Sequence, residues 1–134
     1  PGRVTGVHPN PRPKCWLPPP MSLAKVNVDA ATKRNQKRGT VAAVCRDENG
    51  LFLGASAISF KGVDDPTTLE AMAVRESLAL AQDLYADHIV VACDYKTVLE
   101  EIKMGSEGRY NNIIKEIQAQ ARLFVRCDFI FEGR

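Results

Sequence analysis

The sequence predicts one α/β domain in which three antiparallel strands are followed by alternating helices and strands. Its 134 residues are the length of one domain. Seven of the eight prolines lie within the first 20 residues, so the regular pattern of strands and helices begins only after them. Hydrophobic residues make up 45% of the chain, but no run approaches the roughly 18 to 20 apolar residues that span a bilayer, which excludes a membrane protein.

Residues 1–22 are predicted to be a Pro-rich tail or linker, and residues 23–134 to be the folded domain. The first stretch has almost no apolar periodicity that a core could bury. Trp16, beside the prolines at 18–20, either packs its ring on a neighbouring surface or stays exposed in the linker.

Three strands are expected next. Lys25–Asp29 alternates polar and apolar side chains, which is the period of a half-buried strand. Gly39–Arg46 is rich in Val and Ala, and Leu51–Phe60 forms the third strand. The connections are a polar turn at 32–38 and the turn Asp47–Gly50, whose Asn-Gly pair suits positive backbone dihedrals. Two short turns between three strands indicate an antiparallel meander.

A long helix follows the break at Gly62–Pro66. Thr67 or Thr68 is expected to cap it, and apolar residues recur at helical spacing as far as Leu84.

The remainder alternates again between strand and helix. His88–Cys93 is a nearly continuous apolar run, typical of a strand covered on both faces, and is expected to lie parallel to the first strand because a helix precedes it. Tyr95–Met104 and Asn111–Phe124 are predicted helices, and Val125–Phe131 is the last predicted strand.

The small net charge of +2 hides two regions of opposite sign. Residues 1–38 carry eight Lys or Arg and the single acid Asp29, whereas residues 39–134 carry ten Lys or Arg and fifteen acids. The basic region predicts a polyanionic partner.

The four cysteines are too far apart in the sequence for a Cys-x-x-Cys zinc or redox site, and they are interpreted as small buried hydrophobes. We expect an intracellular protein of the nucleus or cytoplasm, since no signal segment precedes the domain. Because the chain starts at Pro1 rather than Met, we also expect a fragment.

Three acids stand at unusual positions. Asp29 ends the first strand, Glu70 lies in the first turns of the long helix among apolar neighbours, and Asp94 ends the buried strand. Carboxylates in such surroundings need a compensating charge, and divalent cations such as magnesium prefer hard oxygen ligands. If the two strands are parallel, Asp29 and Asp94 emerge at the same sheet edge. Each acid also has an ordinary explanation, as a turn former or as a favourable charge near a helix N-terminus.

In combination, the motifs resemble the plant ribonuclease H-like domain, which is found in retroelement-derived reverse transcriptase polyproteins and in stand-alone plant proteins. The resemblance covers about residues 16–134. It rests on Trp16-x-Pro18-Pro19, Lys25-x-Asn27-x-Asp29-x-Ala31, Arg46-Asp47-x-x-Gly50, Leu69-Glu70-Ala71, and Cys93-Asp94 with Val98-Leu99.

This resemblance implies a ribonuclease H-like fold with a mixed five-stranded sheet and flanking helices. It also implies hydrolysis of the RNA strand of RNA/DNA hybrids with two Mg²⁺ or Mn²⁺ ions. Asp29, Glu70 and Asp94 match the family's first three acidic metal ligands, with Asp29 bridging both ions. In the family mechanism one ion activates the attacking water and the other stabilises the leaving 3′ oxygen.

Two departures from the family pattern stand out. Ala30 follows the first Asp where the family usually has Gly. Phe129–Arg134 looks like the strand and Arg that precede the family's last helix, which carries a fourth acidic position, so we expect the domain to be C-terminally incomplete.

A basic cluster follows Asp29 on the turn between the first two strands. Lys33, Arg34, Lys37 and Arg38 are candidates for binding the phosphates of an RNA/DNA hybrid, which is recognised largely by shape and sugar. Alternatively, the cluster is a solvated hairpin tip or part of a nuclear import signal.

We therefore expect a monomeric, metal-dependent endonuclease. Two alternatives remain open: a catalytically inactive nucleic-acid-binding domain that has kept the fold, and an inactive fragment of a retroelement polyprotein. The intact acid trio favours the nuclease, whereas Ala30 and the missing last helix favour the binding domain.

Overall fold

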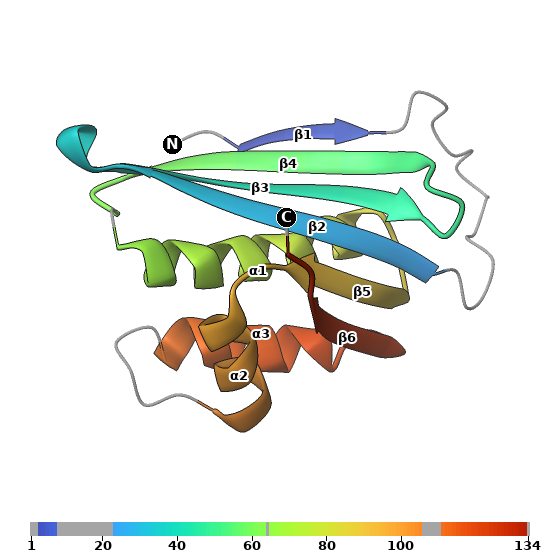
Figure 1. Cartoon of the computed structure of the whole chain (residues 1–134). Helices are drawn as coiled ribbons and strands as arrows, with labels where there is room; N and C mark the ends of the chain where they lie inside the picture. Colours follow the sequence, from blue (N-terminus) through green and yellow to red (C-terminus); the bar gives the residue numbers. More distant parts are fainter. Residues whose placement is uncertain (1–2, 8–22, 64, 106–110, 134) are drawn as a thin grey trace.

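A mixed six-stranded sheet, with helices packed on one side, forms the centre of the molecule (Figure 1). The computed structural model describes residues 3–7, 23–63, 65–105 and 111–133. The strand order is β1-β4-β3-β2-β5-β6.

The predicted meander is confirmed. Strands β2 (Leu23–Lys33), β3 (Arg38–Asp47) and β4 (Phe52–Lys61) pair antiparallel in sequence order. Strand β2 is longer at both ends than the alternating segment 25–29 indicated. The extra length carries the β2–β3 hairpin beyond the N-terminal end of α1, where it projects at the left of Figure 1.

The parallel part of the sheet also agrees with the sequence. Strand β5 (His88–Cys93) pairs parallel to β2, and β6 (Arg126–Phe131) pairs parallel to β5. All five predicted strands are therefore present, in a mixed sheet of the expected arrangement.

A sixth strand is the main departure from the sequence prediction. Strand β1 (Arg3–Val7) lies in the segment expected to be a tail, yet it pairs antiparallel with β4, from Arg3 opposite Ile58 to Val7 opposite Gly54. The outer edge of β4 offers unpaired backbone groups, and a short extended segment satisfies them. The predicted linker at 8–22, with Cys15 and Trp16, lies outside the described residues.

Helix α1 (Pro66–Asp83) begins two or three residues earlier than predicted. The cap is Asp65 rather than Thr67 or Thr68, and its Oδ2 accepts hydrogen bonds from the backbone N–H of Thr68 (3.0 Å) and from Thr68 Oγ1 (2.6 Å). Pro66 fits the first helical position because its missing N–H would have no partner there.

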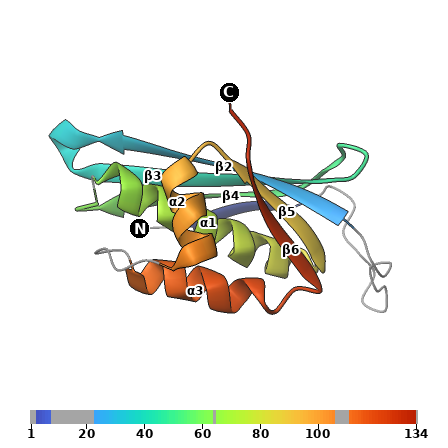
Figure 2. The same ribbon diagram turned by 60° about the horizontal axis from the view of Figure 1, so that its bottom comes forward.

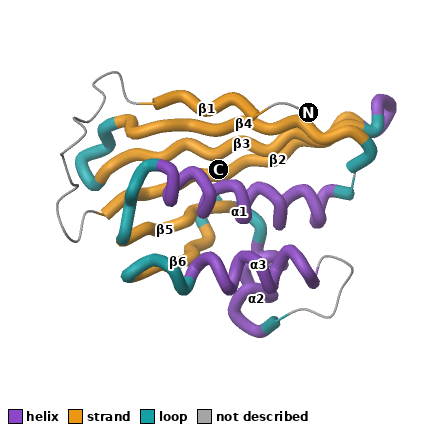
Figure 3. Tube along the Cα trace, turned by 180° about the vertical axis from the view of Figure 1, so that it is seen from behind, coloured by secondary structure: helices purple, strands orange, loops and turns teal. Residues whose placement is uncertain are grey.

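The helices cover one face of the sheet, as the turned views show (Figures 2 and 3). Helix α1 packs across the central strands, while α2 (Lys96–Met104) and α3 (Asn111–Ala121) lie beyond it near β5 and β6. Helix α3 ends three residues before the predicted Phe124, in a turn that buries the Phe124 side chain. None of the helices among the described residues is both long and apolar enough to cross a membrane.

The core lies between α1 and the sheet. It is built from alternate residues of the strands, such as Val26, Val41, Ile89 and Val91, each of which is fully buried. Because side chains alternate along a strand, the intervening residues lie on the opposite face, which carries no described helix (Figure 1).

The described cysteines belong largely to this interior. Cys45 and Cys93 are buried free thiols and Cys127 is half-buried. Burial, together with a neighbouring aspartate, raises the pKa of Cys45 to about 11 and that of Cys127 to about 12. These thiols are therefore protonated at neutral pH and behave as small hydrophobes, as expected from their spacing.

We predict that Gly39→Ala destabilises the fold. A Cβ atom at Gly39 would lie 2.6 Å from Leu69 Cδ1 and 2.8 Å from the backbone oxygen of Val63, so the contact of β3 with α1 must open. Overpacking of this kind costs about 1–3 kcal/mol of unfolding free energy, measurable by urea denaturation. The matched control is Gly133→Ala, where the nearest atom is 3.9 Å away. Equal stability of the two variants would contradict the packing argument.

Candidate active site

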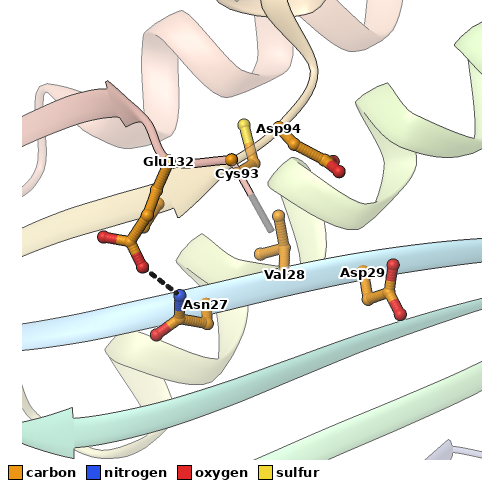
Figure 4. Close-up of a pocket in the computed structure, with 8 residues that line it drawn as sticks. Asn27, Val28, Asp29, Cys93, Asp94 and Glu132 are labelled. Atoms are coloured by element: carbon orange, nitrogen blue, oxygen red, sulfur yellow. Dashed lines mark hydrogen bonds between the residues drawn. The ribbon is translucent and has the colours of Figure 1, made fainter.

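A pocket of about 310 Å³ opens where β5 and β6 end beside the middle of β2 (Figure 4). It is lined by Asn27, Val28, Asp29, Ala92, Cys93, Asp94, Glu132 and Gly133. The carboxyl ends of the parallel strands β5 and β6 form one side of this pocket, and such ends are where open α/β sheets usually bind ligands.

Asp29 and Asp94 reach the pocket through the parallel register of β2 and β5. Asn27 lies opposite Ala92, so Asp29 and Asp94 stand two positions further along their chains. Asp94 follows the end of β5, whereas Asp29 stays inside β2, opposite Ala42 of β3. Both carboxylates are exposed, and Asp29 Oδ1 accepts a hydrogen bond from the backbone N–H of Ala30 at 3.0 Å. The two acids line one pocket, but the expectation that Asp29 ends its strand is wrong, because β2 continues to Lys33.

Glu70 does not line this pocket. It lies in the second turn of α1 and faces a smaller cavity of about 70 Å³ with Ala30, Thr32, Pro66 and Leu69. Ala30 and Thr32 lie on the helix-covered face of β2, whereas Asp29 alternates to the other face. Burial raises the pKa of Glu70, and the negative charges of Asp94 and Asp65 raise it further. Glu70 is thus electrostatically coupled to Asp94 without sharing its pocket.

The donor chemistry of Asp29 and Asp94 fits a hard divalent cation. Both are carboxylates at the rim of one solvent-accessible pocket, and a bound cation would relieve the repulsion that Glu70 experiences from Asp94. Among the described residues, however, no group of three or more His, Cys, Asp or Glu side chains is close enough together to hold a metal ion. The three acids predicted to form one metal site therefore do not converge in this structure, because Glu70 opens onto the other cavity.

The negative charges of Asp29, Asp94 and Glu70 all act on the buried side chain of Tyr95. Its side chain is only 6% exposed, and its hydroxyl has no hydrogen-bond partner among the described residues. Burial raises the pKa of Tyr95, and the charges of Asp29, Asp94 and Glu70 raise it further. The end of the sheet is thus a region of negative potential that favours cations.

Glu132 was not identified from the sequence, although it forms one wall of the pocket. Lys25 Nζ donates to its Oε2 at 2.6 Å. Asn27 Nδ2 donates to its Oε1 at 3.3 Å, as Figure 4 shows. Glu132 reaches β2 across the intervening β5, where Ala92 presents only a methyl group. These hydrogen bonds lower the pKa of Glu132. No local pattern marks this residue, because its partners are 107 and 105 positions away.

The predicted basic cluster occupies the tip of the β2–β3 hairpin. Lys33, Lys37 and Arg38 are all exposed, and the turn between the strands is the short 3₁₀ helix η1 (Arg34–Gln36). Lys37 adopts a φ of 45°, which completes the reversal. The side chain of Arg34 lies outside the described part of the chain.

Comparison with known proteins identifies the family and the fold. A family profile described as "Reverse transcriptase-like" matches residues 27–134. No curated protein matches the chain in sequence.

Several solved structures share the fold. RNase H1 from the halophilic archaeon Halobacterium salinarum has a TM-score of 0.76 and 15% identity, with 84% of this chain and 86% of that chain covered. The N-terminal RNase H domain of rv2228c from Mycobacterium tuberculosis, solved as a fusion with maltose-binding protein, has a TM-score of 0.76 and 19% identity, covering 84% of each chain. LC11-RNase H1 in complex with an RNA/DNA hybrid has a TM-score of 0.71 and 15% identity, covering 83% and 86%. The fold is therefore that of ribonuclease H.

We predict a pH-dependent stabilisation by Glu132. Its pKa is lowered in the folded protein, so its contribution is present above the unfolded value of about 4.3 and is lost as the pH falls through the folded value. Glu132→Gln should lower the Tm at neutral pH, and the difference from the wild type should shrink as the pH falls below the unfolded value and the carboxylate becomes protonated. Thermal unfolding across this range tests it, with the exposed Glu100→Gln on α2 as control. An equal offset at every pH would show that the carboxylate charge is not the cause.

Proposed function

The chain belongs to the reverse transcriptase-like family, and from this premise we propose that it is a nuclease domain that hydrolyses the RNA strand of RNA/DNA hybrids. The observation that carries the proposal is the pair Asp29 and Asp94, which open onto one pocket where β5 ends beside the parallel strand β2. The fold, shared with ribonucleases H of which one is in complex with an RNA/DNA hybrid, supports it.

Asp29 and Asp94 would hold the divalent metal ions, Mg²⁺ or Mn²⁺, and Glu70 on α1 would add negative charge nearby without lining the same pocket. When bound, two such ions supply a water of lowered pKa and stabilise the charge that develops on the leaving oxygen. The contribution of the chain is a fixed pair of carboxylates and a region of negative potential around Tyr95 that attracts the cations. No protein nucleophile is required.

Hydrogen bonds in the wall of the pocket hold together the strands next to Asp29 and Asp94. The bonds from Lys25 and Asn27 to Glu132 tie the end of β6 to β2, and the backbone N–H of Glu132 donates to Cys93 O at 2.9 Å. These contacts cross β5 beside Asp94 and limit the movement of the ends of β5 and β6 relative to β2. Neutralising Glu132 with Lys25 also prevents a further negative charge from competing with Asp29 and Asp94 for a cation.

Binding of the hybrid is assigned to the basic hairpin. Lys33, Arg34, Lys37 and Arg38 supply positive charge for phosphates without reading bases, which suits a duplex recognised by shape and 2′-hydroxyl groups. The hairpin and the pocket both lie along β2, so one duplex can contact both.

A second function is favoured by one observation. Since Glu70 opens onto a separate cavity and no three acids converge among the described residues, a nucleic-acid-binding domain without catalysis is the alternative. The two functions differ in cleavage and not in binding.

We predict that Asp94→Asn abolishes cleavage of the RNA strand of a labelled RNA/DNA hybrid in Mg²⁺ or Mn²⁺. Changes to the outer partners of metal ligands cost about 10–100-fold, so loss of a ligand itself should cost more than about 100-fold. EDTA should abolish cleavage equally. The matched control is Asp83→Asn, an exposed acid at the far end of α1. A folded wild-type chain that binds the hybrid but does not cut it would identify the binding domain instead.

A further inference from the structure

Three cations stand side by side across the sheet at the hairpin end. Lys33 on β2 lies directly opposite Arg38 on β3, and Arg38 lies directly opposite Lys61 on β4. Residues directly opposite on antiparallel strands point to the same face, with Cβ atoms about 4.5–5.5 Å apart. Lys33, Arg38 and Lys61, here called the cation row, therefore form a line of positive charge across three strands.

The cation row is not neutralised within the described part of the protein. All three side chains are exposed. The ion pairs found there join Lys25 to Glu132, Arg75 to Glu116 and Arg126 to Asp128, and none of them involves the row. Like charges directly opposite each other destabilise a sheet. Because the row costs stability and has no acidic partner among the described residues, an external anion would stabilise it.

The cation row faces the same side of the sheet as Asp29. Alternation along β2 places Asn27, Asp29, Ala31 and Lys33 on the face opposite α1. Four residues of strand separate Asp29 from Lys33, a distance of about 13 Å. This corresponds to about four base-pair steps of a duplex at about 3.4 Å each.

The surface between the pocket and the cation row carries small side chains of alanine, serine and threonine. On the same face, Ala31 lies opposite Thr40, and Thr40 lies opposite Ser59, with 3.3 Å between the Thr40 and Ser59 hydroxyl oxygens. The next pairs towards the pocket are Asp29 with Ala42 and Ala42 with Ala57. No bulky side chain of these strands stands between the pocket and the row, so a nucleic-acid backbone can approach both.

We propose that the cation row is a second backbone anchor, which binds phosphates of a nucleic-acid duplex about four base-pair steps from the phosphate held at the Asp29–Asp94 pocket. The inference rests on the proposed function for its substrate and adds Lys61, on a different hairpin strand, to the binding surface. A polyphosphate backbone matches a line of exposed, unpaired cations because its charges repeat along a line, and the contact carries no base specificity.

The test is the salt dependence of binding, measured by fluorescence anisotropy with a labelled RNA/DNA hybrid in EDTA, where cleavage cannot occur. Removing one cation that binds a phosphate reduces the slope of log K against log salt by about 0.9. Lys61→Gln should therefore reduce the slope by about one, and the triple variant Lys33→Gln, Arg38→Gln, Lys61→Gln by about three. Their Tm should equal or exceed that of the wild type, since like-charge repulsion is removed.

Matched controls lie on the opposite side of the molecule. Lys103→Gln on α2 and Lys115→Gln on α3 remove exposed cations from the helical layer and should leave the slope unchanged. Hybrid length gives an independent readout. The wild type should bind a hybrid extending about eight base pairs beyond the cleaved phosphate more tightly than one extending about two, and the triple variant should not distinguish them.

The outcomes separate this inference from the proposed function. An unchanged slope in both row variants, with a wild type that binds, would overturn the cation row and leave the nuclease proposal standing. A reduced slope in Lys103→Gln equal to that of Lys61→Gln would also overturn it, because the effect would then be net charge alone. A wild type that binds no hybrid would overturn both.

Discussion

The parallel pairing of β2 with β5 is the constraint on which the site depends. Its register sets Asn27 opposite Ala92, and this brings two acids 65 positions apart in the sequence to one pocket. The long helix α1 makes the pairing possible, since a parallel connection needs a crossover that returns the chain to the starting edge. Burial of Val26, Ile89 and Val91 against this helix then fixes the register, because a slip by one residue would turn these side chains to solvent.

The same alternation of side chains along β2 places Asp29 and Glu70 on opposite sides of the sheet. Asp29 must lie on the open face if Val26 and the half-buried Val28 are to face α1, whereas Glu70 projects from α1 on the covered side beside Ala30. Ala30, at a position where the family usually has glycine, lines the smaller cavity beside Glu70. Glu70 therefore influences Asp94 through charge rather than through a shared pocket. Its pKa is raised first by burial and further by the charge of Asp94.

Much of this architecture is predictable from local pattern. The alternation in Lys25–Asp29, the apolar run His88–Cys93 and the helix between them predict the parallel pair, and with it the position of Asp29 and Asp94. The features that sequence reasoning missed depend on contacts between distant segments. Strand β1 forms only because β4 has a free edge, and Glu132 gains its role from Lys25 and Asn27, which no local periodicity connects to it.

The open face carries an acidic pair and a row of cations, and one kind of ligand would bind both. At one end, Asp29 and Asp94 concentrate negative charge that a divalent cation would balance, and at the other, Lys33, Arg38 and Lys61 concentrate positive charge without an acidic partner among the described residues. The separation of the two clusters along β2 suits a polyphosphate, whose phosphates meet the row while its bound cations meet the acids. The energetic cost of the cation row in the free protein is thereby recovered on binding, which makes this charge pattern a feature of recognition rather than of folding.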